Sequence, residues 1–473
     1  MKSVRAGLLV IALLALFAVA ASLIMDGSKR AMVAAFVAAA LPVCVYLAIR
    51  KPLIFPFCLY VALIPFDNIM EIQSFGTVTK LLAICSGAAF ILAIARSKKM
   101  QTPPLAAGLW VSFFLWASVT TLWAISPVDS LIRLATYVQL IILYVVVSAM
   151  PATEFDLKVL VWATILGSLA AAVYGYYLFH SGQGVLLSRS GYDVIEREFV
   201  KSGDQTIDPN HFGNALLLPI SIVAMLTLRQ RFGLQKIVFF LVMLVLMLGV
   251  YVSGSRGAIC SVGVVIGYLF LRTRFKLQIA LACGALVGLS FLMPTSPWVR
   301  FTTAVSTGGA GRVDIWKVGV QALKHYWFAG AGPANFQYAY DRSFIQVHQN
   351  YFAHWHRVSH NLIVGTSVEL GVIGLILALA AWYAQWKMLT VVPKNSSLRD
   401  LATALEASVV GLLAAAMFVD MLPYKYMWLA FSLGAIVRTV AIKQSNGEVA
   451  ARFESAAPLY NRRPITQGVG ALN

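Results

Sequence analysis

The chain has 473 residues, of which 60% are apolar and only 12% charged, and its mean hydropathy is +0.79. A soluble domain is roughly 45–50% apolar and about 25% charged, so this composition excludes a string of soluble domains and indicates a polytopic membrane protein. The net charge of +18 does not indicate nucleic-acid binding, because Lys and Arg fall between apolar runs and in the two tails, without any RNP, zinc-finger or helix-turn-helix pattern. This charge is typical of membrane orientation together with local anion binding.

The amino-terminal run 6–25 follows Lys2 and Arg5 and is longer than the apolar region of a signal peptide, which is about 7–15 residues. Further apolar spans follow at once, so we expect an uncleaved first helix. The five cysteines all lie inside apolar stretches without metal-ligand spacing, and we expect them to be packing residues.

About twenty apolar residues cross a bilayer as a helix, and on this basis the sequence predicts an all-α transmembrane bundle of about 12–14 spans. Prolines in the short span 52–66 predict that it is broken or re-entrant. The candidate spans are 6–25, 31–49, 52–66, 79–95, 106–124, 131–149, 158–179, 211–228, 236–252, 257–271, 277–293, 361–386, 402–420 and 425–441.

The positions of Lys and Arg predict the orientation of the bundle. With the amino terminus inside, most of the positive residues near short connections fall on the inner side. We therefore expect both termini to be cytoplasmic and the polar tail 443–473 to be disordered.

Two long loops, 180–210 and 294–360, are predicted on the outer side. The second is rich in Trp, Tyr and Phe, so we expect a folded extracytoplasmic cap. Apolar residues recur in it at helical spacing and predict an amphipathic helix that lies against the membrane surface or the bundle. They are Val313, Trp316, Val320, Leu323 and Trp327.

Two arginines on the outer side are candidates for anion binding. Arg256 lies in the sequence Ser-Gly-Ser-Arg-Gly-Ala between two apolar runs, and Arg312 opens the amphipathic helix, where free N–H groups favour an anion. For Arg256 the alternative is a snorkelling residue in a Gly/Ser turn, and for Arg312 it is an ion pair with Asp314.

His360 lies where the second loop re-enters the membrane, followed by Asn361. A histidine in the first turn of a helix feels the positive end of the dipole, which lowers its pKa and keeps it neutral, as a general base must be. A capping histidine is the alternative. His211 begins another span and could contact a ligand, although a plain helix start is the favoured explanation. Glu369 and Glu406 are intramembrane carboxylates, for which pairing is expected rather than acid catalysis.

No metal or cofactor is expected. The histidines that precede His360 lack the spacing of a zinc motif, and no carboxylate cluster accompanies them. We expect the two outer arginines, the histidine and the aromatic cap to lie on one face of the membrane. This arrangement would suit a diphosphate leaving group beside a base, because arginine binds phosphate oxygens with two parallel hydrogen bonds.

These pieces resemble the bacterial O-antigen ligase/polymerase superfamily over roughly residues 205–375. The resemblance is carried by the Arg256 turn, by Gly311-Arg312 running into Gly-Ala-Gly-Pro at 330–333, and by His360-Asn361 followed by Glu369-Leu370-Gly371. It divides the chain into amino-terminal helices (1–204), a ligase-like core (205–375, with the periplasmic loop 294–360), carboxy-terminal helices (376–442) and the tail (443–473).

The resemblance implies a metal-independent, GT-C-like glycosyltransferase in the bacterial inner membrane, with its active site facing the periplasm. Its donor would be an undecaprenyl-diphosphate-linked glycan, its diphosphate ligands Arg256 and Arg312, and its catalytic base His360. His211, Asn361 and Glu369 are further candidate substrate contacts. The acceptor would be lipid A–core for a ligase, the next repeat unit for a polymerase, or protein Ser/Thr for an O-oligosaccharyltransferase. A multi-span transporter or flippase of lipid-linked glycans is the alternative function.

Overall fold

The computed structural model describes residues 42–67, 76–97, 100–181, 208–291, 311–347 and 356–456, with short strand segments between 71 and 206. It is a helical bundle, as expected, and three two-stranded hairpins lie in its connections. The hairpins pair β1 (Glu71–Ile72) with β2 (Gly76–Thr77), β3 (Val185–Ser190) with β4 (Asp193–Glu198), and β5 (Lys201–Ser202) with β6 (Gln205–Thr206).

Eight helices in the described residues are long and apolar enough to cross a membrane. The bounds of the membrane-region helices are α3 (Phe57–Leu63), η1 (Ile64–Phe66), α4 (Val78–Ser97), α5 (Leu105–Thr120), η2 (Thr121–Trp123), α6 (Pro127–Ala149), α7 (Glu154–His180), α8 (Pro209–Ala215), α9 (Leu217–Arg229), α10 (Leu234–Ser253), α11 (Arg256–Arg272), α12 (Lys276–Phe291), α16 (Leu362–Thr390), α17 (Arg399–Ala416) and α18 (Lys425–Ala456).

The predicted spans agree with these helices in type and differ in some boundaries. The span 52–66 is a short α3 continued by η1, so the prediction of a broken span is confirmed. The span 402–420 ends early at Ala416, because residues 417–424 turn back toward α18. The predicted boundary at 442 falls inside α18, and residues 457–473 lie outside the described residues, as do the span 6–25 and most of 31–49.

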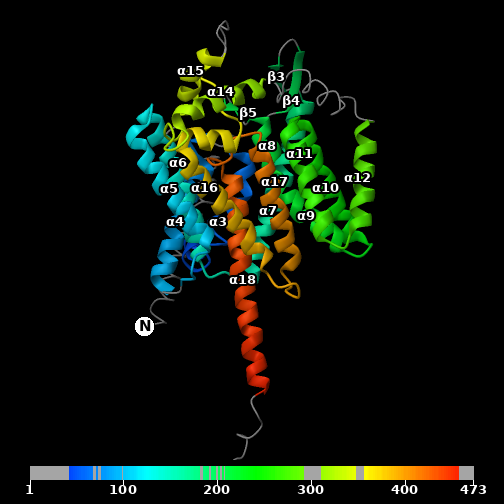
Figure 1. Ribbon diagram of the computed structural model, residues 1–473. Helices are drawn as coiled ribbons and strands as arrows, with labels where there is room; N and C mark the ends of the chain where they lie inside the picture. Colours follow the sequence, from blue (N-terminus) through cyan, green and yellow to red (C-terminus); the bar gives the residue numbers. More distant parts are fainter. Residues whose placement is uncertain are drawn as a thin grey trace, which may run out of the picture.

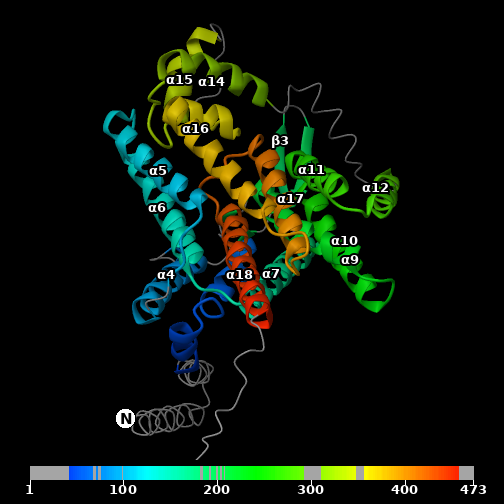
Figure 2. The same cartoon turned by 60° about the horizontal axis from the view of Figure 1, so that its bottom comes forward.

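Helix α18 stands at the centre of the bundle, with α6, α7, α16 and α17 around it (Figures 1 and 2). Within its span 83% of residues are buried, against 22% for α4, which lies at the outside of the bundle. Aromatic rings fill the space beside α18: Trp110, Trp428 and Phe431 lie within 6 Å of one another. The bundle is therefore held by packing around one central helix.

The cap consists of α14 (Arg312–Tyr326) and α15 (Phe336–Val347), which lie across the upper end of the bundle (Figure 1). The amphipathic helix is confirmed. Of its predicted apolar stripe, Trp316 and Leu323 pack against the core of the cap, whereas Val313, Val320 and Trp327 are 42–59% exposed. The face against α15 and α16 is made of smaller residues, namely Ile315, Val318, Gly319 and Ala322. Small side chains let α14 approach closely: a Cβ on Gly319 would lie 2.6 Å from Val364.

Helix α16 is interrupted at Gly371, whose φ is +66°. The loop after α14 binds the interruption: Ala331 and Gly332 donate N–H groups to the carbonyls of Val368 and Glu369, and Val372 donates to Trp327. A buried helix break without such partners would leave backbone groups unsatisfied. The Gly-Ala-Gly-Pro segment thus fixes the cap to the membrane helices.

We expect Gly371→Ala to destabilise the protein, because a Cβ there would lie 2.0 Å from the Phe328 carbonyl and the positive φ disfavours any L side chain. The backbone strain alone is worth about 1–3 kcal/mol. The measurement is the thermal unfolding midpoint of detergent-solubilised protein. Gly263→Ala in α11 is the control, since nothing lies within 4 Å of its Cβ position, and an equal midpoint for the two variants would contradict the prediction.

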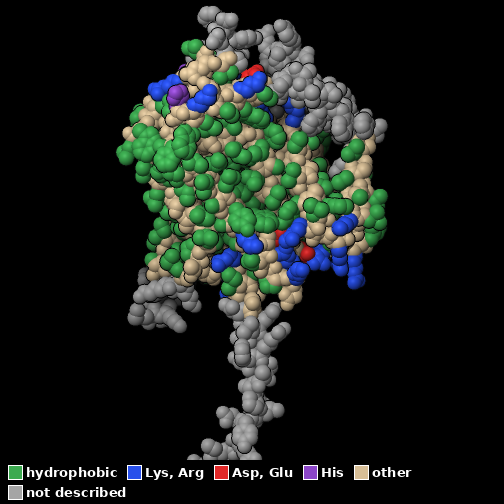
Figure 3. All heavy atoms as spheres, viewed as in Figure 1, with side chains coloured by type: hydrophobic (Ala, Val, Ile, Leu, Met, Phe, Trp, Pro, Cys, Tyr) green, Lys and Arg blue, Asp and Glu red, His purple; other side chains and the backbone are tan. Residues whose placement is uncertain are grey.

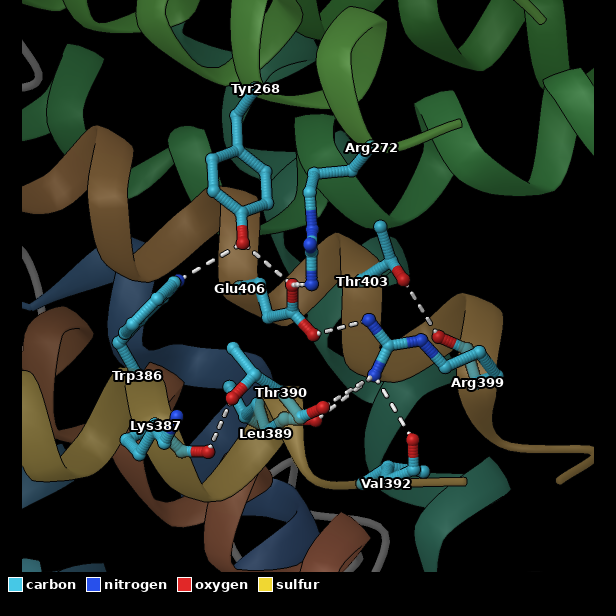
Figure 4. Close-up of polar contacts among 10 residues, drawn as sticks. All are labelled: Tyr268, Arg272, Trp386, Lys387, Leu389, Thr390, Val392, Arg399, Thr403 and Glu406. Atoms are coloured by element: carbon cyan, nitrogen blue, oxygen red, sulfur yellow. Dashed lines mark hydrogen bonds and ion pairs between the residues drawn. The ribbon is translucent and has the colours of Figure 1, made fainter. Parts of the chain in front are cut away.

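A buried polar cluster lies at the end of α11 opposite Arg256 (Figure 4). Its centre is Glu406, whose side chain is 0% exposed and is bound by Arg399 at 2.8 Å, Arg272 at 3.3 Å and the Tyr268 hydroxyl at 2.6 Å. The Arg399 guanidinium also donates to the carbonyls of Leu389 and Thr390 at the end of α16, and to that of Val392 just beyond it. The expectation that Glu406 is paired is confirmed, and the cluster joins α11, α16 and α17.

Candidate active site

His360 lies between the cap and α16, in a segment held from both sides. Its φ is +46°, a left-handed conformation that is uncommon for a residue other than glycine and is found disproportionately at functional sites. Before it, the Trp316 indole N–H donates to the Ser359 carbonyl at 3.0 Å. After it, Asn361 caps α16 by accepting the Val364 N–H at 3.0 Å and donates its amide to the Met417 carbonyl at 3.1 Å. These contacts fix the backbone of His360 in its strained conformation.

The environment of His360 favours the neutral imidazole. Burial lowers its pKa most, and the positive charges of Arg312 and Arg357 lower it further, while Asp208 and Asp420 act in the opposite direction. The expected direction was right, but the cause differs: His360 precedes the cap residue Asn361 and is not in the first turn of α16. Burial and the neighbouring arginines therefore favour the neutral imidazole near pH 7.

Arg312 is the first residue of α14, after Gly311 with a φ of +77°. Its charge acts on His360, so the structure brings these two predicted residues together although 48 positions of sequence separate them. The packing of α14 on α16 through Gly319 and Val364 produces this proximity. A cation beside a neutral base is suited to an anionic leaving group next to a reacting hydroxyl.

Arg256 begins α11, and Ser255 caps this helix by accepting the Ala258 N–H at 3.2 Å. A Cβ on Gly257 would lie 3.0 Å from Phe418, in the same turn to which Asn361 is bonded. The turn of Arg256 is thus packed beside the segment that holds His360. The charges with the largest effect on His360 are nevertheless those of Arg312, Asp208, Arg357 and Asp420.

His211 is in the first turn of α8 and faces the aromatic residues that precede and begin α18. Its ring stacks on Tyr424 with 3.5 Å between ring centroids, and its Nδ1 lies 2.9 Å from the Tyr426 hydroxyl. The charge of His360 acts on His211. Burial, together with Asp420 and Asp208, raises the pKa of Tyr424 to about 12, so its hydroxyl is protonated at neutral pH.

Two further charged residues, which the sequence analysis did not select, lie near the group of polar residues around His360 and His211. Asp420, in the turn between α17 and α18, forms a 2.8 Å ion pair with Arg133 of α6. Both are charged residues at or inside predicted apolar spans, 131–149 and 402–420. Because charged residues inside a membrane usually pair or serve a function, their positions in the sequence could have marked them as candidates. Their pairing could not be foreseen, because 287 positions separate them.

Glu369 lies beside the break in α16. Its carboxylate accepts the Phe336 N–H at 3.4 Å, and its charge interacts with Arg133 and Asp420. It therefore fixes the start of α15 and adds a carboxylate to the polar residues beneath the cap, Arg133 and Asp420. Its role as a substrate contact stays a prediction, as do those of Asn361 and His211.

The described residues contain no group of three or more His, Cys, Asp or Glu that could hold a metal ion. His356 pairs with Asp341 at 2.6 Å, and His348 and His354 lie outside the described residues.

The fold and site define a polytopic membrane protein with a cation- and histidine-containing cluster at one end of its bundle. The O-antigen ligase family model matches residues 240–379. A candidate polysaccharide ligase of Rickettsia conorii is 24% identical over 337 residues, which cover 68% of this chain and 77% of that protein. Residues 240–379 are thus similar to the O-antigen ligase family, and the chain as a whole is similar to a candidate ligase of polysaccharides.

The matched region begins later than the predicted 205 and ends near the predicted 375. It contains Arg256, Arg312, His360, Asn361 and Glu369. The other members of the cluster lie outside it, namely Arg133, Asp208, His211, Asp420 and Tyr424.

Proposed function

We propose that this protein is a metal-independent glycosyltransferase that moves a glycan from undecaprenyl diphosphate to an acceptor hydroxyl on the periplasmic face of the inner membrane. The observation that carries the proposal is the half-buried His360, strained in its backbone and kept neutral beside Arg312. A neutral base next to a fixed cation is what displacement of a diphosphate by a hydroxyl requires.

In this mechanism Arg312 binds the donor diphosphate, and Arg256 joins it by analogy with the family. His360 takes the proton of the acceptor hydroxyl as its oxygen attacks the anomeric carbon. The carbon–oxygen bond to the diphosphate breaks, and its electron pair leaves with undecaprenyl diphosphate, so the configuration inverts. Asp208 and Asp420 stabilise the imidazolium, because their charges favour the protonated form of His360.

The distribution of charge supports an outward-facing site. Lys and Arg side chains gather at the lower end of the apolar band, opposite the cap (Figure 3), where α9, α10, α11 and α12 begin or end at Arg229, Leu234, Arg272 and Lys276. Positive residues favour the cytoplasmic side. We infer that the cap and His360 face the periplasm and that both termini are cytoplasmic.

Replacing Arg312 by glutamine should move the acidic limb of the pH–rate profile to higher pH. Arg312 lowers the pKa of His360, so its removal raises that pKa and His360 becomes protonated, and inactive as a base, at a less acidic pH. The measurement is kcat against pH at saturating donor. An acidic limb that stays in place or moves to lower pH would contradict the role of His360 as the base.

The proposed function is tested by deleting the gene and examining surface glycans. Loss of all long glycan on lipid A indicates a ligase, and a single remaining repeat unit indicates a polymerase. Purified protein in vesicles should form a new glycosidic bond from undecaprenyl-diphosphate-linked glycan. Translocation of that lipid without bond formation would instead support a flippase and overturn the proposal.

A further inference from the structure

A groove lies between α9, α10, α11 and α12, away from the candidate active site. Its volume is about 260 Å³, well above the roughly 150 Å³ of an apolar cavity that holds benzene. Helix α12 stands at the edge of the bundle (Figures 1 and 2), and a Cβ on its Gly284 or on Gly267 of α11 would meet nothing within 4 Å. Phe240 and Ala282 line the groove and are exposed, so the groove opens to the surface of the bundle.

The lining of the groove is suited to a hydrocarbon chain. All four helices contribute apolar side chains, including Met243 and Met247 of α10. The one hydroxyl of the lining, on Thr227, already donates to the Val223 carbonyl at 2.8 Å. The groove therefore offers no free hydroxyl to a sugar or a phosphate. An apolar space of this kind excludes water, and its walls gain contacts only when an apolar group fills it.

The groove runs toward the end of the bundle where Lys and Arg gather, opposite the cap (Figure 3). Lining residues lie less than one helical turn from the basic ends of α9, α11 and α12, and these residues are Leu228, Leu269 and Ile279. The cations in these ends and in their connections are Arg229, Arg231, Lys236, Arg272, Arg274 and Lys276.

Most of these cations have no acidic partner. Arg229 pairs with Asp400, and Arg272 pairs with Glu406. The others form no ion pair with any residue that the structure describes, and they are Arg231, Lys236, Arg274 and Lys276. The basic end of the groove therefore carries an excess of positive charge, which matches a ligand with an anionic head.

Two contacts place these cations beside the groove. The Lys236 ammonium donates to the Gln278 side-chain oxygen at 3.2 Å, so the starts of α10 and α12 meet there. The Lys276 ammonium lies 5.8 Å from the centre of the Phe270 ring, and Phe270 is next to the lining residue Leu269. A head group bound by Lys236 and Lys276 would thus lie directly above a chain in the groove.

We propose that this groove binds an acidic phospholipid, with one acyl chain between α9, α10, α11 and α12 and its phosphate beside Lys236 and Lys276. An undecaprenyl chain fits less well, because its diphosphate would belong near Arg312, under the cap at the other end of the bundle. The lipid site goes beyond the proposed transferase function and does not depend on it.

The test is lipid binding by the full-length protein, purified in detergent, freed of endogenous lipid and examined by native mass spectrometry. Dioleoyl phosphatidylglycerol and dioleoyl phosphatidylcholine share their acyl chains and differ in charge, so the acidic lipid should bind at least about tenfold more tightly. Lys236→Gln/Lys276→Gln should weaken phosphatidylglycerol binding about tenfold or more, since each cation near an acidic lipid contributes about fivefold. Binding of phosphatidylcholine should change less than about twofold.

Lys51→Gln/Arg96→Gln is the matched control for charge. Both residues are exposed, and they flank α3 and α4 on the other side of the bundle from α12 (Figure 2). Binding of both phospholipids should equal that of the wild type. Equal affinity of the wild type for the two phospholipids, or equal losses in the two double variants, would overturn the proposal.

Ala282→Phe tests the groove itself. A phenyl ring at this exposed lining position enters the space of the acyl chain, so binding of both phospholipids should fall at least about fourfold, the equivalent of one buried methylene group. Ala280→Phe is the control, because Ala280 is exposed on the same helix and does not line the groove. If Ala282→Phe does not fold, the charge variants alone decide. Undecaprenyl phosphate that binds more tightly than phosphatidylglycerol, and is lost in Ala282→Phe, would overturn the proposal in favour of an isoprenoid chain.

Discussion

Replacing His360 by alanine is expected to abolish glycan transfer while the protein still inserts and accumulates. General-base catalysis contributes about 10²–10⁴-fold to a rate, so kcat should fall by at least about 10²-fold. Because asparagine tolerates the left-handed conformation that His360 adopts, His360→Asn should keep the unfolding midpoint of the wild type and lose the activity equally. The measurements are transfer by purified protein and recovery of surface glycan in a deletion strain.

His325→Ala is the control, since this exposed histidine at the end of α14 belongs to the same cap. It should leave transfer unchanged. Adding Arg312→Ala to His360→Ala should reduce activity little further, because groups that act as a unit have non-additive effects. Substantial activity in His360→Asn would show that His360 is retained for the backbone turn and not for chemistry.

Removing Arg399 should destabilise the bundle more than the loss of any exposed ion pair. Arg399→Ala leaves the Glu406 carboxylate, which is 0% exposed, with the half-exposed Arg272 as its remaining cation in the cluster. Breaking one side of a buried pair costs about 3–5 kcal/mol. The carbonyls of Leu389 and Thr390, at the end of α16, also lose a donor. The measurement is the unfolding midpoint of detergent-solubilised protein.

Arg229→Ala tests the same chemistry at the surface. Arg229 pairs with Asp400, and both side chains are at least 36% exposed, so its loss should cost no more than about 1 kcal/mol. The double variant Arg399→Leu/Glu406→Leu should recover much of the lost stability, because apolar replacement of a buried pair is often neutral. Equal midpoints for Arg399→Ala and Arg229→Ala would contradict the structural role of the cluster.

Local sequence patterns were sufficient to predict most of the membrane helices and some of the candidate site residues. Runs of apolar residues predicted the membrane helices, because insertion into lipid depends on the composition of each segment alone. Prolines predicted the broken span that became α3 and η1. A charged residue inside an apolar run needs a partner or a function, and this reasoning selected Glu406, Arg256 and Glu369.

Composition and spacing by themselves thus determined that this chain is a polytopic helical membrane protein and that His360 and Arg312 are candidates for its chemistry. Only the tertiary structure decided that Asp420 pairs with Arg133, that His211 stacks on Tyr424, and that the small residues of α14 face inward. The physical reason is that the apolar pattern of a segment shows whether it forms a membrane helix. Which distant side chains meet depends instead on how the helices are arranged around α18.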